Sequence, residues 1–88
     1  MNDQIRIMVK EPEKEPFFMA VENTLKSLQT IVNGYIEVVP VSDRIAIVCN
    51  ENGRLTEKQN CVINGIMHYG TVIWIGLNSA GDELCTLY

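Results

Sequence analysis

Three cysteines and one histidine are the residues of this 88-residue chain that could most directly carry chemistry: Cys49, Cys61, Cys85 and His68. A thiol paired with an imidazole within hydrogen-bonding reach is a nucleophile. The same four side chains could hold zinc only if all of them converged, because no two cysteines have the CxxC or CxxxC spacing of a zinc knuckle. Whether they converge depends on the fold. We predict ordinary structural thiols, and we expect no catalytic residue, no metal and no cofactor.

Two further residues, Glu37 and Trp74, stand inside strongly apolar segments. A carboxylate held among apolar neighbours acquires a shifted pKa and marks a site, but strand alternation would instead point Glu37 outward. An exposed Trp74 would suggest an interface or a stacking platform, but its alternation with Ile73 and Ile75 favours packing in the core or at an edge. We favour the structural interpretation of both and retain both as candidate binding residues.

The remaining candidates lie in residues 54–70, a segment without a clean helical or strand period. We expect this segment to be a functional loop, a turn of helix followed by a loop, or an irregular crossover. Folded over one end of a sheet, it would present Arg54, Lys58, His68 and Tyr69 to a ligand or partner.

The elements that must position these residues are mostly strands. Alternating apolar residues and strand formers predict six of them, over residues 5–10, 17–22, 35–41, 44–50, 71–77 and 83–88. The charged, proline-containing EPEKEP is a solvated connection, and Ser42 with Asp43 forms a short turn. Pro40 cannot donate to a ladder, so its strand lies at an edge or carries a bulge. Turns are also expected at residues 50–53 and 78–82.

One helix is predicted over residues 24–33, where Leu25, Leu28, Ile31 and Val32 form an apolar stripe. Asn23 is expected to cap its first turn. Gly34 is expected to end it in the left-handed conformation, which glycine adopts without a side-chain clash.

The predicted order is therefore strand, strand, helix, strand, strand, irregular loop, strand, strand. Short turns between neighbours favour a mostly antiparallel sheet of five to six strands with one main helix on one face. This is a two-layer α+β fold, and the length predicts a single globular domain over residues 1–88.

Charge and hydropathy exclude several classes of function. A formal charge of −4 disfavours general binding to nucleic acid, which needs a basic face. The apolar runs are far shorter than the roughly 20 residues that cross a bilayer, and we find no secretory signal pattern. An odd number of cysteines does not complete a disulfide framework, so we expect reduced thiols and a cytoplasmic protein.

Four segments in order resemble an uncharacterised family, domain of unknown function 3846. They are the opening strand with EPEKEP, then SLQTIVNGYIEVVPV, IAIVCNENGRL and GTVIWIGLNSAGD. The resemblance implies a small protein encoded by bacteria, phages or other mobile elements, and it implies no activity and no catalytic residue.

These observations support two hypotheses of function. The first is a non-catalytic interaction module, an accessory phage or mobile-element protein that acts on a host factor in the host cytoplasm. The alternative is a protein that binds or sequesters a small ligand such as a nucleotide. One helix covers only one sheet face, so we also expect a homodimer, made through the second face or the C-terminal edge.

Overall fold

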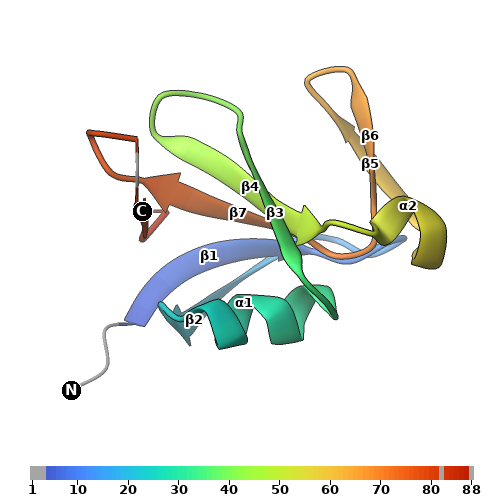
Figure 1. Ribbon diagram of the computed structural model, residues 1–88, viewed down its shortest axis with the longest axis horizontal. Helices are drawn as coiled ribbons and strands as arrows, with labels where there is room; N and C mark the ends of the chain where they lie inside the picture. The colour runs from blue at the N-terminus through green and yellow to red at the C-terminus, as the bar shows by residue number, and fades with distance from the viewer. Residues whose placement is uncertain (1–3, 82, 88) are drawn as a thin grey trace.

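One antiparallel sheet organises the chain, with a helix packed on one face and a separate hairpin on the other (Figure 1). The computed structural model describes residues 4–81 and 83–87. Its elements are β1 (Gln4–Lys10), β2 (Phe17–Glu22), α1 (Leu25–Val32), β3 (Ile36–Pro40), β4 (Ile45–Asn50), α2 (Gly53–Thr56), β5 (Gln59–Ile63), β6 (Ile66–Tyr69), β7 (Val72–Leu77) and β8 (Leu84–Cys85). Asp82 and Tyr88, which belong to the predicted turn 78–82 and strand 83–88, lie outside the described residues.

The main sheet has the strand order β2-β1-β7-β4-β3, and β8 pairs with β7 outside this path. All of these pairings are antiparallel. Strand β7 lies between the β1–β2 and β3–β4 hairpins and joins them. The predicted α+β class with a mostly antiparallel sheet is confirmed, as is the edge position of the strand that carries Pro40. Over the described residues there are two helices, of eight and four residues, where the sequence predicted one main helix.

The main core lies between the sheet and α1, and Figure 1 shows this helix beside one face of the sheet. Alternation places every second residue of β1, β4 and β7 on this face. Leu28 and Val32 of α1 are buried against them. The buried sheet residues of this core are Ile5, Ile7, Val9, Ala46, Val48, Ile73, Ile75 and Leu77. At about eight residues, α1 depends on this packing rather than on its own propensity.

Both predicted end residues of the helix were wrong by one position. Thr24, not Asn23, is the N-cap, and its Oγ1 accepts a hydrogen bond from the Ser27 amide at 3.2 Å. Asn23 instead donates from Nδ2 to the Leu84 carbonyl at 3.1 Å, which ties the start of α1 to β8. At the other end, Asn33 is the left-handed residue, with a φ of 63°.

Gly34 is needed for a close approach and not for a left-handed turn. A Cβ at this position would lie 2.5 Å from Nδ2 of Asn50, which packs under the end of α1. The glycine therefore lets the chain pass over a buried side chain of β4.

An apolar row crosses the second face of the sheet from edge to edge. Its members, each paired with the next across neighbouring strands, are Phe18, Met8, Trp74, Ile47 and Val39. Ile47 is completely buried, whereas Phe18 is 60% exposed at the β2 edge. The row is thus covered at one side of the sheet and open at the other.

The β5–β6 hairpin covers part of this face (Figure 1). It occupies most of residues 54–70, for which the sequence left three alternatives: a functional loop, a turn of helix followed by a loop, or an irregular crossover. Asn64 and Gly65 form its turn with φ values of 49° and 80°, both left-handed. Ile63 packs against the second, smaller cluster of buried residues, which includes Ile47 and Val72. Residues 54–70 are therefore a short helix followed by a hairpin that lies on the sheet.

The C-terminal segment is not a free edge. Gly76 of β7 pairs with Ile45 on one side and with Cys85 of β8 on the other. The Leu87 amide then donates to the Arg6 carbonyl of β1 at 2.8 Å. Among the described residues of the predicted final strand, Leu84 and Cys85 pair as a strand. Within the described residues, no helix is long and apolar enough to cross a membrane.

Candidate functional site

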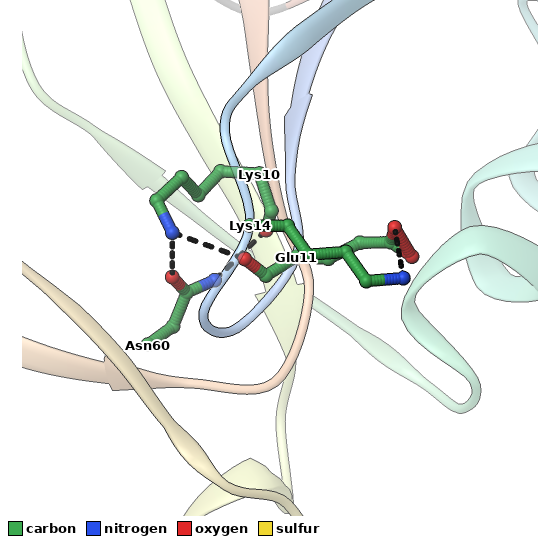
Figure 2. Close-up of polar contacts among 4 residues, drawn as sticks. All are labelled: Lys10, Glu11, Lys14 and Asn60. Carbon is green, nitrogen blue, oxygen red and sulfur yellow. Dashed lines mark hydrogen bonds and ion pairs between the residues drawn. The ribbon is translucent and has the colours of Figure 1, made fainter.

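Asn60 anchors the base of the β5–β6 hairpin to the main sheet (Figure 2). Its Nδ2 donates to the Lys10 carbonyl at 2.8 Å and to the Gly70 carbonyl at 2.7 Å, and its Oδ1 accepts from Lys10 Nζ at 3.1 Å. The same ammonium donates to the Glu11 carbonyl at 3.0 Å, and the Glu11 carboxylate pairs with Lys14 at 3.6 Å. One amide thus joins the end of β1 to both ends of the hairpin segment.

The turn of the hairpin makes a weaker contact at the far side of the sheet. Asn64 Nδ2 donates to the Val41 carbonyl at 3.5 Å, which is long for a hydrogen bond. Together with the hydrogen bonds of Asn60 at the base, this contact holds the hairpin at both of its ends. Strand β6 then faces β3 and the end of β4 across the cleft.

Asn50 fixes the chain where it leaves β4 for α2. The side chain is only 8% exposed. Its Nδ2 donates to the Val32 and Asn33 carbonyls at 3.2 and 3.0 Å, and its Oδ1 accepts from the Asn52 amide at 2.8 Å. It therefore satisfies carbonyls at the end of α1 and shapes the turn that starts α2.

Gly53 sets α2 directly against the hairpin. A Cβ at Gly53 would lie 2.9 Å from the Tyr69 carbonyl oxygen, so only glycine allows this approach. Arg54, the next residue, is thereby held beside β6.

These contacts create a cleft of about 310 Å³ between β6, α2 and the ends of β3 and β4. The lining combines apolar walls with a few charged or polar groups. It consists of Glu37, Val39, Cys49, Asn50, Glu51, Gly53, Arg54, Ile66, Met67, His68 and Tyr69.

His68 is the most informative residue of this cleft. It is 8% exposed, and its imidazole makes no hydrogen bond with another described residue. Every fully buried side-chain nitrogen or oxygen in the described part of the chain has a partner. The ring nitrogens of His68 must therefore reach open space, and the cleft that this residue lines provides it.

Arg54 is exposed at the α2 side of the cleft. Among the described residues, the Arg54 guanidinium has no carboxylate partner. Glu37 and Glu51 line the same cleft, but neither carboxylate forms an ion pair with the Arg54 guanidinium.

The Cys49 thiol is poorly suited to act as a nucleophile. Burial, and secondarily the negative charge of Glu37, raise the pKa of this thiol. Its Sγ donates to the Glu37 carbonyl at 3.9 Å. An activated cysteine needs the opposite shift, because the thiolate is the reactive form.

The structure brings four of the six predicted site residues into one cleft: Glu37, Arg54, His68 and Tyr69. Glu37 is exposed at the rim, as strand alternation predicted. Lys58 is exposed and does not line the cleft. Trp74 lies half-buried in the apolar row and packs against the smaller cluster.

The four chemically reactive residues do not gather at one point. Cys49 and His68 share the cleft, Cys61 pairs with His68 across the hairpin, and Cys85 lies on β8. All three thiols are free. No group of three or more potential metal ligands occurs among the described residues.

Sequence reasoning missed Glu51, Val39 and the hairpin residues Ile66 and Met67. The missed signal was the Asn-Gly pair at residues 64 and 65, which favours a two-residue hairpin turn. This pair predicts a hairpin over residues 59–69, and the second strand of that hairpin carries Ile66 and Met67.

The chain belongs to the family described as a domain of unknown function, DUF3846, whose model matches residues 5–88. No curated protein and no solved structure matches the chain.

Proposed function

We propose that this protein is a small, non-catalytic interaction module that binds an extended segment of a partner protein along the outer edge of β2. In this mode, main-chain hydrogen bonds add a strand to a sheet, and pockets for alternate side chains give specificity. The observation that carries the proposal is that β2 ends the sheet while exposing Phe17 (43%) and Phe18 (60%).

The two edges of the sheet differ in how well they resist pairing. On the β3 edge, Pro40 removes a donor and Glu37 adds a charge. The β2 segment FFMAVE has no proline and no lysine, and its one charge, Glu22, stands at its last residue. Since charges and prolines are the usual protection of an edge strand, β2 is the edge that favours a partner.

Both faces beside β2 offer apolar surface to an added strand. On the second face, Phe18 begins the apolar row. On the helix face, a groove of about 400 Å³ separates β2 from α1 and is lined in part by Met19, Val21 and Ile31. An added strand would therefore find contacts for side chains on both of its faces.

Two further features support the details of the proposal. The raised pKa of the Cys49 thiol supports a binding role rather than a catalytic one. Free thiols at all three cysteines suit a cytoplasmic protein. The partner we propose is a host factor, with the chain acting as an accessory protein of a phage or another mobile element.

Without its partner, we expect the β2 edge to pair with a second copy of the chain. A two-fold axis through Met19 would place Phe18 opposite Ala20 and Phe17 opposite Val21. Each pair then lies on one face of the joint sheet. This homodimer uses the β2 edge and the open end of the second face, because the C-terminal segment is occupied by β1 and β7.

The test compares Phe18→Lys on β2 with Val38→Lys on β3, which is a matched control because Val38 is also exposed, at 40%. Both variants should stay within about 0.5 kcal/mol of the wild-type stability, as is usual for exposed positions. The tagged wild type and both variants are used for capture from host lysate and for light scattering.

We expect proteins captured by the wild type and by Val38→Lys to be lost with Phe18→Lys, and the dimer mass to fall only in Phe18→Lys. Capture that is equal for all three proteins, or no protein enriched over the tag alone, contradicts the proposal. A monomer mass for the wild type contradicts the homodimer and leaves the partner proposal in place.

A further inference from the structure

Beyond this edge, we infer that the cleft between β6 and the ends of β3 and β4 binds a small planar ligand with one phosphate, of the nucleoside monophosphate class. This site is separate from the β2 edge, because the cleft is lined by β3, β4, α2 and β6.

The size of the cleft limits the ligand. Its volume of about 310 Å³ lies at the lower end of the range of roughly 300–1,000 Å³ seen for ligand sites. A single nucleotide suits such a volume, and a dinucleotide does not. The apolar walls from Val39, Ile66 and Met67 suit the faces of a flat heterocycle.

His68 supplies the first specific contact. A neutral imidazole offers one donor and one acceptor, and neither is used by another described residue. Because the ring nitrogens of His68 reach the open space of the cleft, they remain available to a bound ligand. The edge of a nucleobase carries adjacent donors and acceptors, so it could satisfy the ring of His68.

Arg54 supplies the second contact. Arg54 lines the cleft, and its guanidinium has no carboxylate partner among the described residues. The planar fork of arginine binds phosphate oxygens in pairs. The anionic group of the ligand therefore belongs at the α2 side of the cleft.

The two carboxylates restrict the charge of the ligand. Glu37 and Glu51 line the cleft and can accept hydrogen bonds from ribose hydroxyls. They also repel added negative charge, because both carboxylates line the cleft that the ligand would occupy. A monophosphate should therefore bind better than a triphosphate.

The test is a titration of the ¹⁵N-labelled full chain, followed by nuclear magnetic resonance, with AMP, GMP, CMP and UMP in turn. For the monophosphate that binds best, the matching nucleoside, the matching triphosphate, ribose 5-phosphate and inorganic phosphate are added separately. We expect saturable shifts at the amides of β6 and α2. We expect affinity to fall by roughly tenfold or more without the phosphate, the usual effect of losing a charge-assisted hydrogen bond.

Lys58 provides the matched control, because it belongs to the same segment but does not line the cleft. Arg54→Gln should weaken binding by roughly tenfold or more, whereas Lys58→Gln, with the same change in charge, should change it by less than about twofold. His68→Gln should weaken binding without changing the preference for phosphate.

The inference is overturned if none of the four monophosphates gives saturable shifts, or if Arg54→Gln and Lys58→Gln weaken binding equally. Shifts confined to β2 would also overturn it. Phe18→Lys should bind the ligand as the wild type does, so failure at the β2 edge and failure at the cleft are distinguishable.

Discussion

Replacing Asn50 is the sharpest test of how this fold holds its cleft. The amide donates to two carbonyls at the end of α1 and accepts from the Asn52 backbone. Asn50→Ala removes all three hydrogen bonds. Asn50→Asp keeps an acceptor for the Asn52 amide but removes both donors, and it places a negative charge beside the end of α1, where the helix dipole disfavours it.

The expected loss follows from the three bonds. A typical intramolecular hydrogen bond contributes about 1 kcal/mol net, and an orphaned buried partner costs more, so Asn50→Ala should lower the free energy of unfolding by about 3 kcal/mol. Asn50→Asp should cost at least as much, because repulsion replaces attraction. Against a typical total of about 5–15 kcal/mol for a domain, this is a large fraction.

Urea unfolding followed by the fluorescence of Trp74, the one tryptophan, measures these changes. Asn52→Ala is the control, since the Asn52 side chain makes no capping bond, and it should stay within about 0.5 kcal/mol of the wild type. If Asn50→Ala changed the free energy of unfolding by as little as Asn52→Ala does, the Asn50 side chain would not be what joins α1 to β4. Our account of how the fold holds the cleft would then be wrong.

Three other substitutions test separate features. Gly76→Ala would set a Cβ against the Thr86 carbonyl, so we expect a loss of about 1–3 kcal/mol and faster amide exchange at Leu87; unchanged exchange would contradict this. Gly65→Val meets no neighbour, so its cost of about 1–2 kcal/mol should come from the left-handed backbone alone and appear as faster exchange in β5 and β6. The raised pKa of Cys49 means that the native state holds its proton more tightly than the unfolded chain does. Stability should therefore fall as pH rises above about 8.5, where the unfolded thiol ionises, and Cys49→Ala should show a shallower fall when urea unfolding is repeated from pH 8 to 10.

The strand pattern was the most predictable part of the fold. Alternation located β1, because burial of one sheet face leaves a period of two in the sequence. Short runs of strand formers located β2 and β7, and β7 is buried on both faces. The same alternation correctly turned Glu37 toward solvent.

The helix ends were harder because tertiary contacts chose between equivalent local options. Asn23 and Thr24 can both cap a helix. Asn23 does not cap α1, because its side chain donates a hydrogen bond to the Leu84 carbonyl instead. Likewise, Asn33 and Gly34 can both adopt a left-handed turn, but the packing of Asn50 requires the glycine at the second position. The local sequence around the helix does not indicate either distant partner, the Leu84 carbonyl or the Asn50 side chain.

The candidate site was predictable by residue type but not by geometry. Arg54, His68 and Tyr69 were chosen because they are polar or aromatic residues in a segment without a clean period. The structure places them together through the β5–β6 hairpin and the close approach of Gly53 to β6. Lys58 was chosen on the same basis and lies elsewhere, since nothing in its local sequence indicates which side of the chain faces the cleft.

The β5–β6 hairpin also explains why the two proposed binding features lie at different places on one molecule. It is too narrow to cover the whole second face, and its anchors, Asn60 at the end of β1 and Asn64 beside Val41, hold it across one part of that face. Where it stands apart from β3 and β4 it leaves the cleft. Where it does not reach, the apolar row runs out to Phe18 uncovered. A ligand in the cleft and a strand added at β2 would therefore touch opposite ends of the same row, and neither would have to displace the other.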